Sequence, residues 1–439
     1  MTDSIQANSV FYSESSQTIL NVGDVFKKPT QVEKKEVSSE IFSSWGDDNL
    51  YPQSVVKKVG EVSLVGPILE WKARALYGGG MIYGIQEVNE SGEETFKRII
   101  DEEIENWMLA TDIQDYLMRA SIEFFYFYNI FPELITNKSG DQILYLTCKQ
   151  ATDCRWGKKE KGGYISKCFL NDWENSSTVE AKDGIQVYSP FDEKFQKLLE
   201  EKKKALRFIY PVFQPSPGRN YYQKAPWHVL FDTWYEIAKA IPLWKAALMK
   251  NQIFIKYVIH VPEHYWTRKY KDWNNKSEKD QVAIIKKEHK EFNDFFTKVE
   301  NQGKSIMVTE LNEVNGKKYK DWKVEAVGDQ IKEGTYIEDS QEADAHIFKN
   351  LNVDPTIFGS GPGKNTTSSG SGSDKRVAYN IYLTQQTPYQ DLIVKPLHFI
   401  ARFNGWEERL APGPNKKLVF KFKNIYIATL DAGKETETK

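Results

Sequence analysis

The sequence is poor in cysteine and has no long hydrophobic run. Its 439 residues include three cysteines, Cys148, Cys154 and Cys168. Their odd number and spacing fit neither a disulfide framework nor a CxxC metal pair, and the simplest interpretation is a reducing compartment. No apolar run approaches the roughly 20 residues that span a bilayer. Residues 1–4 lack the basic and apolar pattern of a secretion signal, so we expect a protein made in the cytoplasm.

The sequence also lacks an excess of basic residues. It has 59 Lys and Arg against 61 Asp and Glu, a formal net charge of −2. Proteins that wrap nucleic acid by neutralising phosphates carry a basic excess, so any contact with DNA should be loose, local or transient. Aromatic residues are abundant at 13%, which fits either a rich core or subunits that pack against one another.

No motif of a catalytic, nucleotide or metal site is complete. Residues 359–364 come close to the phosphate-binding pattern GxxxxGK[ST]. The spacing is one residue short, and Asn365 occupies the position of the magnesium-binding hydroxyl. His260 and His264 have a zinc-like spacing, but Pro262 breaks any helix between them. HExxH and GxSxG motifs do not occur. We therefore expect a protein that is not an enzyme and has no cofactor and no metal site.

The pattern of apolar residues and breaks predicts an α+β protein. A polar, weakly patterned arm covers residues 1–44. The first helix should end at three glycines, residues 78–80, and the aromatic run 124–131 should leave the helical state. Pro242 should kink a helix of roughly 35–40 Å over residues 226–252. We expect helices over residues 64–77, 94–123, 226–252, 276–299, 333–350 and 374–404, and strands over residues 81–85, 142–148, 154–157, 164–169, 253–261, 305–311, 321–327, 417–423 and 425–429.

Turns and loops are expected at three places. Residues 137–141 should form a hairpin turn, and Asn315-Gly316 a second one. The last long helix should break or bend near Pro388 and Pro396. Residues 359–373 are rich in Gly and Ser, so we expect a flexible loop between two helices.

Four features in this order resemble the portal proteins of tailed bacteriophages. The turn WGDDNLYP at residues 45–52 precedes a helix that ends in glycines. The helix 226–252 leads into a β-run and the helix 276–299, as a portal stem leads into its clip. The helix 333–350 is similar to the family's second stem helix, followed by the turn NVDPTIFG at residues 352–359. The Gly/Ser loop lies where portals carry their channel loop.

The resemblance implies a portal fold with wing, stem helices and an α/β clip, and with little or no crown because the chain is short. After the arm, its parts would be the wing over residues 45–225, the first stem helix over 226–252, the clip over 253–330, the second stem helix over 331–358, the channel loop over 359–373, the remaining wing over 374–430 and a tail over 431–439.

The resemblance further implies a ring of identical subunits, typically twelve, at one capsid vertex of the virion. Such a ring assembles in the host cytoplasm and guides double-stranded DNA during packaging and ejection. Its partners would be the major capsid protein, a scaffold, the terminase and a neck or tail adaptor, with no membrane.

Two sets of residues are candidates for contact with DNA in such a channel. The loop and the helix after it could touch the duplex through Lys364, Asn365, Thr366, Thr367, Ser368, Ser369, Lys375 and Arg376. Glu338, Asp339 and Glu342 could form an acidic side of the second stem helix that repels phosphates, although an ordinary solvated face explains them equally well.

Three other functions are compatible with the sequence. A neck or capsid-associated virion protein would share the aromatic content but would not need two stem helices. A metal-dependent nucleic-acid-processing enzyme would need carboxylates that converge in a cleft. A carbohydrate-binding module would expose its aromatic residues, which here fall mostly at core-like spacing.

Overall fold

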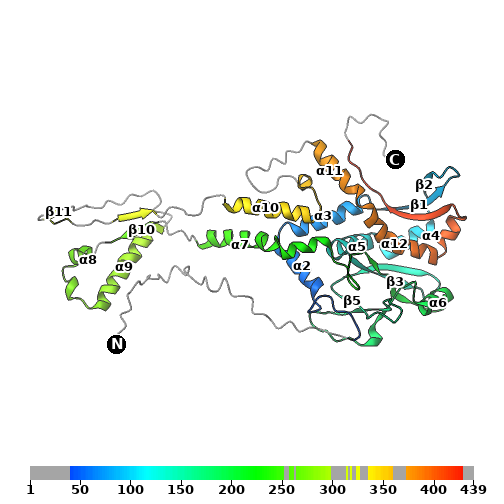
Figure 1. The fold of residues 1–439 in the computed structure, drawn as a ribbon, viewed down its shortest axis with the longest axis horizontal. Coiled ribbons are helices and arrows are strands. Elements are labelled where there is room, and N and C mark those ends of the chain that lie inside the picture. The colour runs from blue at the N-terminus through cyan, green and yellow to red at the C-terminus, as the bar shows by residue number, and fades with distance from the viewer. Residues whose placement is uncertain are drawn as a thin grey trace. The chain divides into compact units, whose positions relative to one another are not determined.

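The computed structural model describes residues 40–251, 257–261, 264–297, 313–314, 317–318, 323–326, 335–358 and 372–428 (Figure 1). Its contacts divide these residues into two units. The smaller unit runs from Leu243 to Thr335, and the larger unit combines the residues up to Pro242 with those from Tyr336 onward. Helices and strands occur in both units, which confirms the predicted α+β class.

The larger unit begins earlier than expected. Ser43 donates its backbone N–H to the carbonyl of Trp156, and Phe42 pairs with Gly157. Phe42 is buried against Phe169 and Trp173. Residues 40–44, which we had assigned to the arm, therefore pack on the domain because Phe42 has an apolar site to fill; residues 1–39 lie outside the described residues.

Two helices and a three-stranded sheet follow. Helix α2 spans Tyr51–Glu61, and α3 spans Val65–Tyr77 and ends at Gly78 with a positive φ of 51°, as its glycines predict. Strand β1 (Met81–Val88) pairs with β2 (Glu94–Arg98) and with β14 (Lys416–Phe422), both antiparallel.

The predicted helix over residues 94–123 is wrong at both ends. Residues 94–98 form β2, because they complete the sheet beside β1. Helices α4 (Glu102–Thr111) and α5 (Ile113–Phe127) are separate, and Asp112 between them is left-handed with a φ of 50°. The aromatic residues up to Phe127 stay helical, because Phe124 and Phe125 are fully buried and this burial outweighs their β propensity.

A seven-stranded sheet forms the rest of this half. Its strands are β3 (Asn129–Thr136), β4 (Ile143–Lys149), β5 (Cys154–Trp156), β6 (Lys167–Leu170), β7 (Ile185–Val187), β8 (Arg207–Ile209) and β9 (Val212–Phe213), in the order β4-β3-β8-β7-β6-β5 with β9 beside β3. The hairpin turn between β3 and β4 is confirmed, and β7 and β8 pair in parallel across α6 (Glu193–Glu201), which the sequence analysis missed.

The helix predicted over residues 226–252 starts later. Pro226–Asp232 form a 3-10 helix. It ends at Thr233, whose φ of −133° and ψ of −96° are not helical. Helix α7 then spans Tyr235–Asn251 with Pro242 inside it. Its 17 residues correspond to about 26 Å, not 35–40 Å. The first segment does not continue the helix because Trp227 and Leu230 are buried and the Trp227 indole N–H donates to the carbonyl of Phe125.

The smaller unit contains short strands and helices. Strand β10 (Tyr257–His260) pairs antiparallel with β13 (Lys323–Ala326), and β11 (Glu313–Val314) pairs with β12 (Lys317–Lys318) around the predicted Asn-Gly turn. Its helices are α8 (His264–Lys269) and α9 (Glu278–Thr297), joined by the 3-10 turn Trp273–Asn275. The strand expected over residues 305–311 lies outside the described residues.

The C-terminal half of the larger unit begins with α10 (Thr335–Asn350) and the 3-10 turn η5 (Pro355–Phe358). Helices α11 (Gly372–Thr384), α12 (Thr387–Phe403) and α13 (Trp406–Leu410) then lead into β14. The break near Pro388 is confirmed, whereas Pro396 lies within α12. The strand predicted from residue 425 is wrong over residues 425–428, because the Asn380 side chain, not a strand, bonds both backbone groups of Ile427.

Among the helices of the described residues, none combines the length and the apolar character needed to cross a membrane.

Candidate functional site at the base of residues 359–371

The structure describes some of the predicted site residues. Lys364, Asn365, Thr366, Thr367, Ser368 and Ser369 lie outside the described residues. Lys375 is exposed and Arg376 half-buried near the start of α11, while Glu338, Asp339 and Glu342 are exposed on α10. These helices precede and follow residues 359–371 in the sequence, so the described part of the candidate site consists of the elements that flank this segment.

The end of α10 is fixed by local chemistry. Asn352 has a positive φ of 53°, and the backbone N–H of Val353 donates to the carbonyl of Phe348. This is a Schellman ending, in which asparagine tolerates the left-handed conformation and the next apolar residue is buried. Pro355 then prevents the helix from resuming. The motif NVDPTIFG thus stops α10 and turns the chain toward Phe358.

Aromatic contacts with α3 hold the elements on both sides of residues 359–371. The Trp71 ring lies 5.3 Å from the Phe358 ring, the last described side chain before these residues. The same indole lies 4.8 Å from Tyr382 and 6.4 Å from Tyr379, both on α11. Aromatic pairs at such centroid distances stabilise by about 0.5–1.5 kcal/mol beyond their burial, so Trp71 ties η5 and α11 to one helix.

Lys72 is a buried cation at the same place. Its ammonium donates to the carbonyl of Leu351 over 2.7 Å and lies 4.9 Å from the centre of the Phe125 ring. Burial lowers the pKa of Lys72 to about 8. The Leu351 carbonyl belongs to the C-terminal end of α10, where the helix dipole favours a positive charge, so this helix end takes the place of a carboxylate partner.

Helix α10 has one buried and one acidic side. Ala343, Ile347 and Phe348 are buried, whereas Glu338 and Glu342, four positions apart, are exposed. Asp344 is half-buried, and burial raises the pKa of its carboxyl group. The predicted acidic set therefore lies on the solvent side of this helix.

The opening motif WGDDNLYP has a structural role. Trp45 stacks on Tyr222 with ring centres 4.1 Å apart, and the Tyr222 hydroxyl donates to the carbonyl of Ser43. The side-chain oxygen of Asn49 accepts bonds from the Trp45 backbone N–H and from Arg155 Nε. Arg155 is fully buried and also donates to the Asn49 carbonyl. The motif is therefore fastened to β5 by one guanidinium.

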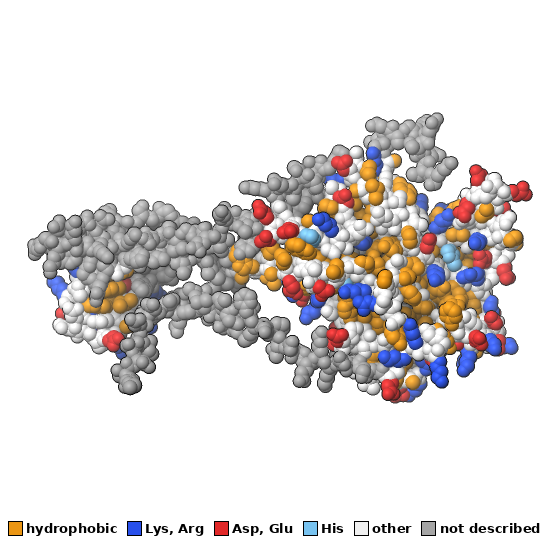
Figure 2. Space-filling model, in the orientation of Figure 1, with side chains coloured by type: hydrophobic (Ala, Val, Ile, Leu, Met, Phe, Trp, Pro, Cys, Tyr) orange, Lys and Arg blue, Asp and Glu red, His pale blue; other side chains and the backbone are white. Residues whose placement is uncertain are grey.

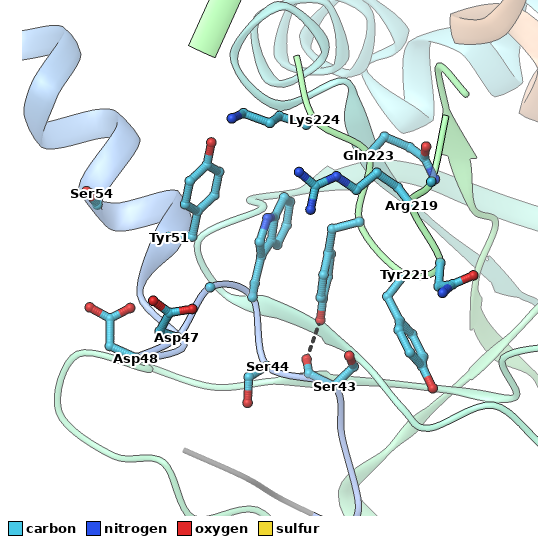
Figure 3. A pocket seen from close by; sticks show the side chains of 15 residues that line it. Ser43, Ser44, Asp47, Asp48, Tyr51, Ser54, Arg219, Tyr221, Gln223 and Lys224 are labelled. Carbon is cyan, nitrogen blue, oxygen red and sulfur yellow. Dashed lines mark hydrogen bonds between the residues drawn. The ribbon is translucent and has the colours of Figure 1, made fainter. Parts of the chain in front are cut away.

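A cavity of about 700 Å³ lies beside this motif. The segments 43–54 and 218–224 line it, and Tyr51 lies between Asp47 and Asp48 on one side and Arg219 and Lys224 on the other (Figure 3). Because it contains charges of both signs, the cavity presents no field of one sign to an anion such as a phosphate.

The residues that suggested other chemistry do not form a metal site, although Cys154 and Cys168 lie in contact on the paired strands β5 and β6. Cys148, Cys154 and Cys168 are free and buried, and burial raises the pKa of the Cys148 thiol. His260 ends β10 and His264 begins α8, so they do not share a helix. Within the residues that the structure describes, no group of three or more His, Cys, Asp or Glu side chains could hold a metal ion.

Sequence reasoning missed Trp71, Lys72 and Arg155, although one of them carried a signal. Lys72 follows Val65, Ile68 and Leu69 at helical spacing, on the side that α3 buries. A lysine in that position has to find a carbonyl, a carboxylate or an aromatic ring, but the sequence does not say which.

The fold resembles solved structures, whereas no family model and no curated protein matches the sequence. A chain described in "Neck of empty GTA particle computed with C6 symmetry" is 12% identical with a TM-score of 0.52, over 84% of each chain. A chain of "Virion of native gene transfer agent (GTA) particle" is 11% identical with a TM-score of 0.51, again over 84% of each. A chain of "Neck of native GTA particle computed with C12 symmetry" is 12% identical with a TM-score of 0.50, over 85% of each. The chain thus shares its fold with components of gene transfer agent particles.

Proposed function

We propose that this chain is a structural virion protein and, more specifically, the subunit of a portal ring. The observation that carries the proposal is the fold shared with neck chains of gene transfer agent particles over 84% of both chains. The order of elements supports it, because α7 leads into the smaller unit and α10 returns from it to residues 359–371 and α11.

In this proposal the parts have distinct roles. Residues 45–225 and 374–430 form the wing, α7 and α10 belong to the stem, and residues 253–330 form the clip that meets the terminase and later a neck or tail adaptor. The ring, typically of twelve subunits, occupies one capsid vertex beside the major capsid protein, after assembly in the host cytoplasm. The chain has no catalytic role and needs no cofactor.

A ring needs apolar surface that a second copy can cover. Val377 and Ile381 on α11 lie on the same helix as Asn380, whose side chain bonds the backbone of Ile427. We call the following residues the α11 strip; each is between 40% and 54% exposed: Val377, Ile381, Ile425, Tyr426 and Ile427. Contiguous exposed apolar residues mark interaction surfaces, and a head-to-tail ring buries surface of every subunit against its neighbours. The related folds occur in particles solved with sixfold and twelvefold symmetry, which favours a second copy as the occupant.

DNA passes the ring at residues 359–371 in this proposal. Lys364, Lys375 and Arg376 touch phosphates, and Asn365, Thr366, Thr367, Ser368 and Ser369 brush the duplex. The acidic side of α10 repels it. The charge of the chain fits such sliding contact, since tight phosphate binding would stall the DNA. On the face drawn in Figure 2, acidic and basic side chains are intermixed.

Imaging of the purified protein tests the ring. We expect negative-stain images of rings with a central hole and a mass near twelve subunits. Ile381→Glu should reduce the ring fraction, because it places a charge in the α11 strip. Leu109→Glu is the matched control, since Leu109 is an exposed apolar residue on α4, outside the strip. A compact closed dimer without a channel would contradict the portal proposal, and rings formed equally well by Ile381→Glu would exclude the strip as the interface.

Deletion of residues 361–371 tests the contact with DNA. The shortened protein should still form rings, because the deletion leaves every residue of the α11 strip in place, but particles assembled with it should package or retain less DNA. Packaging at the wild-type level would refute a role for this segment.

A neck or capsid-associated protein other than the portal is the second candidate, because the related chains are described as neck components. Such a protein would be incorporated into virus particles but would not be needed for DNA packaging. A metal-dependent nucleic-acid-processing enzyme is the third, and would show turnover that depends on a divalent cation.

A further inference from the structure

We infer that Trp71 and Lys72 are positioning residues that hold α10 with η5 and α11, which we call the base of residues 359–371, at a fixed separation. They are consecutive on α3, and each contacts an element that flanks this segment. The fixed separation follows from the contacts alone. That it matters for DNA rests on the proposed function. We call the two residues, with their partners Leu351, Phe358 and Tyr382, the loop clamp.

Trp71 contacts both sides of the base with one ring. Phe358 comes directly before the segment and Tyr382 lies ten residues into α11, and the indole lies about equally far from both rings, at 5.3 and 4.8 Å. Phe358 is held a second time by Phe348 of α10, at 5.6 Å. Any widening of the base would therefore separate at least one aromatic pair.

Lys72 fixes the end of α10 relative to α3. Its ammonium is buried and donates to the Leu351 carbonyl, so a movement of this helix end would leave a buried cation without a partner, which is costly. A third contact joins the two sides directly, because the Asn352 side chain donates to the Gln385 side chain over 3.3 Å. Helix α3 lies beside α10 and α11 (Figure 1) and contacts both of them.

A fixed base matters because the segment itself has the composition of a flexible linker. A Gly/Ser-rich chain of this length has a root-mean-square extent of about 20 Å. If its ends are held, the volume that its side chains sample depends only on the length and composition of the segment. If its ends can separate, the same side chains spread over a larger volume, and each contact with a passing duplex becomes rarer.

Distance measurement between two spin labels tests the clamp. Cysteines replace Lys349 at the end of α10 and Ser373 at the start of α11, both exposed. The three native cysteines are buried, which favours labelling at the new positions. Labelled protein is diluted with unlabelled protein so that only distances within one subunit are read. We expect one narrow distribution in the otherwise wild-type protein.

The variants separate the clamp from general stability. Trp71→Ala and Lys72→Met should broaden the distribution at least twofold, and Trp71→Phe should keep it narrow because it retains the ring contacts. Trp107→Ala is the control, since Trp107 packs on Trp406 away from the clamp and its loss should lower the melting temperature without broadening the distance. If Trp71→Ala does not fold, Trp71→Leu keeps the apolar volume and replaces it.

The outcomes are distinguishable. A distribution as narrow in the folded Trp71 and Lys72 variants as in the wild type would overturn the clamp, whatever the protein does. Broad distributions would support it, and DNA packaging by the same variants then tests the proposed function. Packaging below the wild-type level is expected, whereas normal packaging with a broad base would count against a role of the segment in contacting DNA.

Discussion

Replacement of Arg155 by methionine should strongly destabilise the larger unit. The guanidinium is fully buried and donates to carbonyl and amide oxygens of the residues that the structure describes. Burial lowers its pKa to about 10, so it remains charged at neutral pH. Methionine retains much of the apolar volume of the side chain but none of the donors, which makes the substitution a test of the hydrogen bonds.

The magnitude follows from the bonds that are lost. Four of them join buried groups: those to Asn49 Oδ1 (2.6 Å), the Asn49 carbonyl (2.5 Å), the Ala151 carbonyl (3.2 Å) and the Cys154 carbonyl (2.8 Å). At a net contribution of about 1 kcal/mol each, Arg155→Met should cost about 4 kcal/mol. Arg155→Lys supplies three donors in place of these four bonds and should cost about 1 kcal/mol.

Urea unfolding followed by tryptophan fluorescence measures these costs, because Trp45 and Trp173 lie against the guanidinium. Arg119→Met is the matched control. Arg119 forms an exposed pair with Asp115 one helical turn away, and its loss should change the free energy of unfolding by less than about 0.5 kcal/mol. If Arg155→Met lowered the free energy of unfolding as little as Arg119→Met, water would have replaced the guanidinium as the hydrogen-bond donor to these carbonyls. Arg155 would then not be the residue that holds the opening motif on β5.

Two further predictions concern stability. His228 accepts a bond from the Tyr51 hydroxyl at Nδ1 and donates from Nε2 to the Tyr126 carbonyl, and burial lowers its pKa to about 4. The unfolded chain therefore binds a proton that the folded one excludes, so about 3 kcal/mol of stability, present above pH 6.5, is lost as the pH falls to 4; in urea unfolding His228→Gln should lack this slope, and an unchanged slope would exclude His228. Gly140 has a φ of +83°, and an added Cβ would lie 2.2 Å from the Lys204 carbonyl oxygen. Gly140→Ala should lower the melting temperature more than Gly92→Ala, whose φ is +82° with open space around it; equal effects would show that the close approach is unimportant.

Some elements could be predicted from the sequence because their causes are local. The glycines after Tyr77 end α3, and the turn NKSGD at residues 137–141 joins β3 to β4. Proline marks the break between α11 and α12. The motif at residues 352–359 likewise ends α10 through one left-handed asparagine and one proline. In each case the deciding groups lie within a few residues of one another, so neighbouring side chains and backbone angles suffice.

Other features depended on partners far away in the sequence. Residues 94–98 are a strand only because β1 offers an edge, and the aromatic end of α5 stays helical only because a core receives it. Lys72 and Leu351 are 279 positions apart, and Arg155 and Asn49 are 106 apart. A buried cation requires a partner wherever the fold can supply one, and a single sequence does not show which distant carbonyl that will be. The sequence alone therefore determined where local breaks end α3, α10 and α11, whereas the tertiary structure decided which distant groups hold these helices together.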